Sequence, residues 1–135
     1  MTDYDFEIMA KTIYGEARGE SRQGQTAVAC VIFNRFRSKK WFSAKTLAGV
    51  CLKPLQFSCW NKSDPNSQIL ANLPYSAYSK YFDVIKEAEK GDITNGATHY
   101  CTYAVLSRTK WAVGKEPCFC LLYTSDAADE ARSVD

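Results

Sequence analysis

Two glutamates stand four residues apart in the segment YGEARGES, residues 14–21. A carboxyl group held at a helix end against apolar neighbours can have its pKa raised by desolvation, and a general acid working near neutral pH needs that shift. If one helix continued through Gly19, Glu16 and Glu20 would stand one above the other, near the roughly 5 Å carboxyl separation of a retaining glycosidase. Two glycines oppose that continuity. In the alternative interpretation, Glu20 suits the dipole of a second helix and Arg18 neutralises the pair.

The helix that must carry Glu16 is visible as an apolar stripe. Its members recur at helical spacing: Phe6, Met9, Ala10, Ile13 and Ala17. This pattern predicts an amphipathic helix with one buried face, and it places Glu16 at the last turn. Tyr14 and Ile13 are the candidate walls of a site around that carboxylate.

Further helical patterns follow. Small and branched residues at helical spacing predict a second helix that runs to about Ser38. Residues 44–51 predict a short helix, and residues 78–88 predict a third long helix that ends at Gly91. The segment 98–103 alternates and is β-prone, which predicts one arm of a small sheet or hairpin. We therefore expect a mainly α (α+β) single domain, with a small β hairpin or sheet in its C-terminal third.

Composition sets limits on function. The chain has 135 residues, 46% of them hydrophobic and 24% charged, and a net charge of +2. One domain of ordinary composition fits this length, and so weak a charge does not indicate a nucleic-acid binder. No apolar run is long enough to span a membrane. We expect a monomer without membrane insertion.

The N-terminal residues indicate the cellular compartment of synthesis, and the cysteines indicate whether the chain can bind a metal ion. The first residues are polar and acidic, without the features of a signal peptide, which predicts a protein that is cytoplasmic at synthesis. Six cysteines and the single His99 show no zinc-ligand spacing, so we expect free thiols, no metal and no cofactor. The cysteines are Cys30, Cys51, Cys59, Cys101, Cys118 and Cys120.

Six short blocks of the sequence form a recognisable series. The first, AKTIYGEARGE at residues 10–20, is the most specific. The others are GQTAVA at 24–29, NR at 34–35, QFS at 56–58, GATHY at 96–100 and WAVG at 111–114. Taken in order, these blocks resemble the cell-wall hydrolase family of the spore-cortex-lytic enzymes, which also occurs as small phage and prophage lysins.

The resemblance implies a lysozyme-like domain that cleaves the muramic acid to glucosamine bond of peptidoglycan, and it carries the catalytic glutamate onto Glu16. In that family cleavage is commonly lytic transglycosylation, in which the substrate's own 6-hydroxyl replaces a second carboxylate. The residues expected to bind the glycan are Glu20, Gln56, Phe57, Tyr100 and Trp111. Phe57 and Trp111 fit ordinary core aromatics equally well, and Asn34 and Arg35 are expected to brace their helix.

The C-terminal segment departs from the family. Members usually close with a segment of the type Ile-Gly-x-His-x-Phe, which this chain lacks. Back-translation of residues 120–135 resembles a transposase adapter used in sequencing libraries. We therefore expect a truncated hydrolase domain over residues 1–119 and a non-native tail over 120–135, and we expect the product to act on the wall after release, as a lysin does.

Two other functions stay open. The domain can be a non-catalytic peptidoglycan-binding or germination accessory module that keeps the fold. It can also be a wall peptidase or amidase with His99 as base and Cys30, Cys59 or Cys101 as nucleophile. Because His99 is the only histidine, any such pair must use it.

Overall fold

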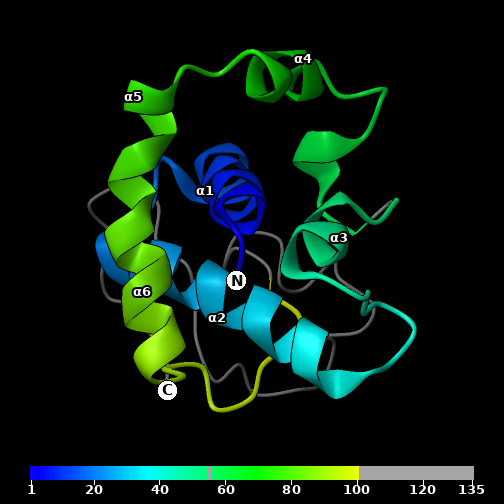
Figure 1. Cartoon of the computed structure of the whole chain (residues 1–135), viewed down its shortest axis with the longest axis vertical. Helices are drawn as coiled ribbons and strands as arrows, with labels where there is room; N and C mark the ends of the chain where they lie inside the picture. The colour runs from blue at the N-terminus through cyan, green and yellow to red at the C-terminus, as the bar shows by residue number, and fades with distance from the viewer. Residues whose placement is uncertain (55, 101–135) are drawn as a thin grey trace, which may run out of the picture.

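A central helix organises this protein. The computed structural model describes residues 1–54 and 56–100. Helix α1 packs against α2, α3, α4, α5, α6 and both short 3-10 helices, and Figure 1 shows it end-on in the middle of the others. In chain order the elements are α1 (Asp3–Ala17), α2 (Arg22–Ser38), α3 (Leu47–Leu52), η1 (Ser58–Trp60), α4 (Asn66–Ala71), α5 (Tyr75–Tyr78), η2 (Ser79–Tyr81) and α6 (Phe82–Lys90).

The N-terminus of α1 is fixed by a reciprocal cap. The Thr2 hydroxyl accepts a hydrogen bond from Asp5 N at 3.1 Å, and the Asp5 carboxylate accepts one from Thr2 N at 3.0 Å. This arrangement satisfies two backbone donors that a helix start leaves free. The buried Asp5 also accepts a hydrogen bond from Ala48 N at 3.0 Å, so the same carboxylate joins α1 to α3.

The apolar stripe predicted for α1 is buried. Met9, Ala10 and Ile13 are fully inaccessible, and Ala17 is 3% exposed. They pack with Val28, Ala29 and Ile32 of α2 and with Val84 and Ile85 of α6 in one core. Because this core encloses the last turns of α1, the position of Glu16 follows from the packing of the whole domain.

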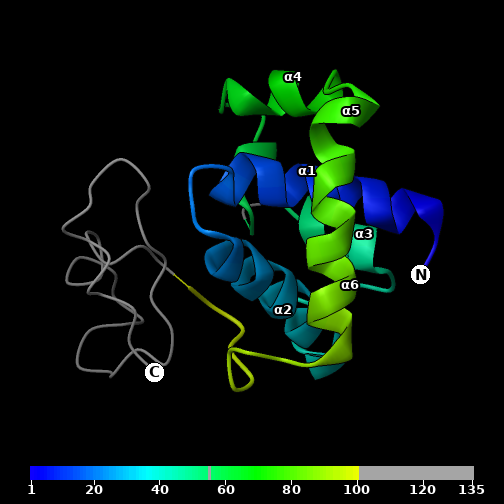
Figure 2. The same cartoon turned by 90° about the vertical axis from the view of Figure 1, so that its left-hand side faces the viewer.

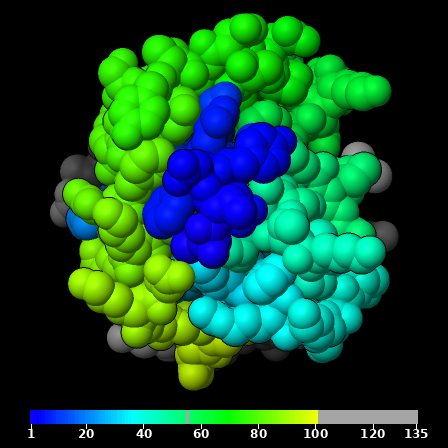
Figure 3. All heavy atoms as spheres, in the orientation of Figure 1, coloured from blue at the N-terminus to red at the C-terminus, as the bar shows by residue number. Residues whose placement is uncertain are grey.

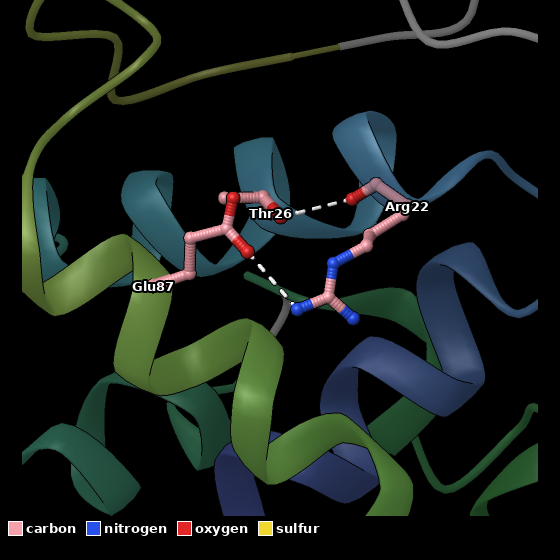
Figure 4. Close-up of polar contacts among 3 residues, drawn as sticks. All are labelled: Arg22, Thr26 and Glu87. Carbon is pink, nitrogen blue, oxygen red and sulfur yellow. Dashed lines mark hydrogen bonds and ion pairs between the residues drawn. The ribbon is translucent and has the colours of Figure 1, made fainter.

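Helices α2 and α6 lie side by side and are joined at the surface. Figure 4 shows the Arg22 guanidinium reaching Glu87 of α6, with a nitrogen to oxygen distance of 3.0 Å. The Thr26 hydroxyl, one turn further along α2, donates to Arg22 O at 2.9 Å. Both ends of the ion pair are more than half exposed, so we expect it to contribute little to stability.

The third helix predicted from the sequence is divided. Residues 75–90 form α5, the 3-10 turn η2 and α6 in succession, and Figure 2 shows them as one column that crosses α1. In the part of the chain that the structure describes, no helix is long and apolar enough to cross a membrane.

The predicted α+β fold class is wrong. Residues 1–54 and 56–100 contain helices, turns and irregular segments but no strand, and residues 98–100, the described part of the predicted arm, have no regular secondary structure. The reason lies in α2, whose side chains donate hydrogen bonds to backbone carbonyls that a neighbouring strand would otherwise use. Asn34 Nδ2 donates to Ala97 O at 2.9 Å, and Arg35 Nε donates to Thr98 O at 2.7 Å. The rest of the predicted arm, residues 101–103, lies outside the described residues.

Candidate active site

Glu16 stands on the last turn of α1, and both of its carboxylate oxygens are held. Oε1 accepts a hydrogen bond from the Tyr100 hydroxyl at 2.6 Å, and Oε2 accepts one from Cys59 N at 3.2 Å. The side chain is half-buried, and it forms no ion pair with any residue in the described ranges. Three parts of the chain that are distant in sequence therefore fix the carboxylate of one half-buried side chain.

Gly15 explains how η1 comes so close to α1. A Cβ added at Gly15 would lie 2.7 Å from Cys59 Cβ, 2.8 Å from Cys59 Sγ and 3.1 Å from Leu70 Cδ1. Real Cβ atoms do not approach other atoms to 2.7 Å. The glycine before Glu16 thus leaves the space that lets Cys59 N reach the carboxylate.

Tyr100 reaches Glu16 because α2 and a tight turn hold its segment. The carboxylate of Asp92 accepts hydrogen bonds from Thr94 N at 2.8 Å, Gly96 N at 2.7 Å and Asn34 Nδ2 at 3.0 Å. The turn itself needs a positive φ at Asn95 (57°) and at Gly96 (84°), which these two residue types tolerate.

The hydrogen bonds of Asp92 are reflected in its acidity. Burial acts to raise the pKa of Asp92, but the donors of Thr94, Asn34 and Gly96 outweigh it and lower the pKa to about 2. The turn that presents Tyr100 is therefore organised around an ionised carboxylate at neutral pH.

The Tyr100 hydroxyl keeps its proton and therefore acts as a hydrogen-bond donor. Loss of hydration raises its pKa well above the ordinary value, and the negative charge of Glu16 adds to the effect. The phenol stays protonated at any physiological pH, so it donates to Glu16 and does not compete with it as a base.

Arg35 is a buried cation next to this pair. Its side chain is 5% exposed, and its guanidinium lies 4.7 Å from the ring centroid of Phe57 and 5.8 Å from that of Phe42. Burial lowers its pKa, while the negative charge of Glu16 acts in the opposite direction. An arginine remains charged under such a shift, so it provides a fixed positive charge that interacts with the Glu16 carboxylate. Among the described residues, Arg35 Nη1 has no hydrogen-bond partner.

Glu20 is not stacked above Glu16. Helix α1 ends at Ala17, with Arg18 as its cap, so the two glutamates do not share one helix. Glu20 N donates to Ala17 O at 2.9 Å in the turn toward α2. Burial raises the pKa of Glu20, and one of its oxygens is buried without a partner in the described part of the chain.

The other predicted glycan-binding residues occupy different positions. Gln56 is partly exposed near η1, whereas Phe57 is 1% exposed and its ring is covered by Arg35. Phe57 therefore has no free face for a sugar in this structure. Trp111 lies outside the described residues.

Sequence reasoning missed three contributors to the site. Cys59 was considered only as a thiol, but its backbone N–H is the group that Glu16 uses. Trp60 donates through Nε1 to the Thr12 hydroxyl at 2.8 Å, which ties η1 to α1. Arg35 was expected to brace its helix, and it instead holds the segment that ends in Tyr100. The available signal was the glycine beside Glu16, because a helix glycine indicates close approach of another chain segment.

The described thiols do not resemble activated nucleophiles. Burial raises the pKa of Cys30 to about 11 and that of Cys51 to about 12. Burial, together with the charge of Glu16, also raises the pKa of Cys59. A nucleophilic cysteine needs a lowered pKa, so these three residues do not favour the peptidase or amidase alternative. Cys101 lies outside the described ranges.

No cluster in the described residues suits a metal ion. None of them forms a group of three or more His, Cys, Asp or Glu side chains close enough to bind one. His99 contacts the Thr98 hydroxyl through Nδ1 at 3.0 Å and packs edge-on against Phe42.

Comparison with known proteins identifies the family of this chain. A family model described as Cell Wall Hydrolase matches residues 19–120, which confirms the resemblance found in the motifs; the matched range begins after Glu16. A spore cortex-lytic enzyme of Halalkalibacterium halodurans is 35% identical over 99 residues, covering 73% of this chain and 27% of that protein. Those of Bacillus subtilis and Oceanobacillus iheyensis are 44% and 46% identical over 54 residues, or 40% of this chain and 17% and 19% of theirs.

The chain spans 27% or less of the length of these three curated relatives. No solved structure matches it. The lysozyme-like part of the predicted fold class therefore has no support from known structures.

Proposed function

This chain belongs to the cell wall hydrolase family, and on that premise we propose that it cleaves the glycan strand of peptidoglycan with Glu16 as general acid and base. The observation that supports this proposal is the half-buried carboxylate at the end of α1, held by Tyr100 and Cys59 and close to the charge of Arg35. A group fixed in position before substrate binds is what general acid–base catalysis requires.

The reaction that we propose is lytic transglycosylation. Protonated Glu16 donates its proton to the glycosidic oxygen as the bond from that oxygen to the anomeric carbon of muramic acid breaks. The resulting Glu16 carboxylate takes the proton of the 6-hydroxyl, whose oxygen bonds to the same anomeric carbon and closes an anhydro ring. Glu16 ends protonated and no water is consumed, so one carboxyl group completes the cycle.

The surroundings of Glu16 favour a mechanism with one carboxylate. The groups that contact its oxygens in the described part of the chain are the Tyr100 phenol and the backbone amide and thiol of Cys59. Helix α1 ends at Ala17, before Glu20, the other acid of the motif, so Glu20 does not stack on Glu16. In such a scheme a hydroxyl of the substrate takes the place of the second carboxylate of the two-carboxylate mechanism.

Roles for the neighbouring residues follow from their contacts. Tyr100 and Cys59 N keep the carboxylate in one orientation, so the Glu16 side chain does not have to change rotamer before it transfers a proton. Arg35 supplies positive charge where the carboxylate forms, and its burial makes that charge effective because little water screens it.

The test is digestion of purified peptidoglycan by the wild-type chain and by Glu16→Gln. We expect the wild type to release anhydro-muropeptides and the variant to release none. Glu89→Gln is the matched control, because Glu89 is exposed on α6 and the same charge is removed. Cortex and vegetative peptidoglycan are tested side by side, since the named relatives are spore cortex-lytic enzymes.

Three results would contradict parts of this proposal. Products one water heavier than the anhydro forms would indicate hydrolysis instead of transglycosylation. Full lysis by Glu16→Gln would remove Glu16 from the chemistry. Sedimentation of the wild-type protein with peptidoglycan, without any released product, would indicate the non-catalytic binding module.

A further inference from the structure

A second feature of the surface lies at the opposite end of α1 from Glu16. It is a pocket of about 410 Å³, which we call the aromatic pocket, between α1, α5 and α6. Figure 3 shows this face, where the blue N-terminal turn of α1 lies beside the green atoms of the later helices. The lining residues are Asp3, Phe6, Glu7, Tyr75, Tyr78, Phe82 and Lys86.

Four of these residues form one aromatic cluster. Tyr75 lies edge-on to Tyr78 at 5.5 Å and to Phe82 at 5.9 Å between ring centroids, and Phe6 lies edge-on to Phe82 at 5.4 Å. Edge-to-face contacts of this kind fix the rings in place. Tyr75 is 64% exposed, so a large part of its ring faces solvent over the pocket.

Charged groups complete the lining. Glu7 is paired with Lys11 at 2.9 Å, but Asp3 and Lys86 have no ion-pair partner among the residues that the structure describes. The pocket therefore offers an aromatic surface, a carboxylate acceptor and an ammonium donor together. An apolar ligand would leave both charges unused, and a simple anion would leave the rings unused.

We propose that the aromatic pocket binds one N-acetylhexosamine unit of a peptidoglycan strand. The apolar face of a pyranose ring packs on an aromatic side chain, its hydroxyls donate to a carboxylate such as Asp3, and Lys86 can pair with the carboxylate of a muramic acid substituent. This inference rests on the proposed function for the identity of the polymer, and it adds a binding site distinct from the Glu16 site.

The position of the pocket determines what it does. Phe6 and Asp3 precede Glu16 by ten and thirteen residues on α1, which corresponds to about 15 to 20 Å along the helix axis. At 100° per residue they also lie on a different side of α1 from Glu16. A sugar bound there is not the one being cleaved, so the site holds the domain on an insoluble polymer and increases binding through a second contact.

The experiment measures binding without cleavage. All variants are made in the Glu16→Gln background, and the protein that sediments with purified, insoluble peptidoglycan is titrated. We expect Tyr75→Ala to bind at least about tenfold more weakly, as when one of two linked contacts is removed. Tyr75→Phe keeps the ring and should retain binding.

Tyr4→Ala is the matched control. Tyr4 is a tyrosine of similar exposure, 55%, near the start of α1, and it does not line the pocket. Equal binding by Tyr75→Ala and Tyr4→Ala would overturn the inference. A change of oligomeric state in Tyr75→Ala, seen by analytical ultracentrifugation, would also overturn it, because a second copy would then be the occupant.

The result is separable from the proposed function. If the wild-type chain releases no product but Tyr75→Ala still loses binding, the pocket is a glycan site on a non-catalytic domain. If the wild-type chain cleaves peptidoglycan and Tyr75→Ala binds normally, the proposed function stands and the pocket inference is wrong.

Discussion

Gly15→Ala is the most informative perturbation of this protein. The new methyl group would stand 2.7 Å from Cys59 Cβ, whereas ordinary contacts begin at 3.4 Å. To remove this steric clash, α1 and η1 must separate locally by about 0.7 Å. The hydrogen bond from Cys59 N to Glu16 Oε2, already 3.2 Å long, would then lengthen to about 3.9 Å and be lost.

The expected cost to stability is moderate. Overpacking of this kind costs about 1–3 kcal/mol, and the higher helix propensity of alanine returns about 1 kcal/mol. The net loss in the free energy of unfolding is then about 0–2 kcal/mol, which urea denaturation can measure. Catalysis should suffer more, because displacement of a catalytic group by nearly 1 Å can cost about 100-fold in rate.

Lysis is assayed as release of labelled fragments from peptidoglycan, at a temperature where every variant is folded. We expect Gly15→Ala to be about 10- to 100-fold slower than the wild type. Gly91→Ala is the control, because a Cβ there meets nothing within 4 Å. The double variant Gly15→Ala/Cys59→Gly, which deletes the clashing atoms on η1, should recover part of the rate. Equal activity of Gly15→Ala and Gly91→Ala would refute the reasoning.

Two further predictions concern the segment that carries Tyr100. Tyr100→Phe should lower the maximal rate of lysis about tenfold, since a hydrogen bond to a charged group contributes about 1.5 kcal/mol or more, while half-saturation by peptidoglycan stays unchanged; a change in half-saturation alone would instead assign Tyr100 to substrate binding. The pKa of Asp92 is depressed to about 2 from 3.8 in the folded state. Its contribution to stability is therefore complete above about pH 4 and disappears as the pH falls toward 2. Denaturation curves of the wild type and Asp92→Asn should differ at pH 6 and converge toward pH 2; a constant difference would show that the charge of Asp92 is not involved.

The helices around Glu16 could be predicted from sequence because their information is local. The spacing of Met9, Ala10 and Ile13 specifies the buried face of α1, and these residues are inaccessible in the structure. The end of α2 at Ser38 was also predicted. In both cases one apolar periodicity and its nearby breakers determine the element, whatever the rest of the chain does.

The segment after Gly91 shows where local information fails. The segment 98–103 has the alternation of a strand, yet the carbonyls of Ala97 and Thr98, where it begins, accept hydrogen bonds from side chains of α2 more than 60 positions away in sequence. A propensity describes what a segment does when backbone partners are available. Asn34 and Arg35 replace those partners, and no pattern within residues 98–103 could reveal it.

The same contacts connect the fold to the chemistry. Asn34 holds Ala97 and Asp92, Arg35 holds Thr98, and Tyr100 follows two residues later to meet Glu16. On the other side Gly15 admits η1, whose backbone supplies the second hydrogen bond. The short motifs NR, GATHY and YGE are thus parts of one arrangement, in which each adjoins or contributes a contact of a single carboxylate. Neither Asn34 nor Gly15 forms a hydrogen bond with that carboxylate. Changes at these two residues should therefore alter the reaction by moving the Glu16 carboxylate.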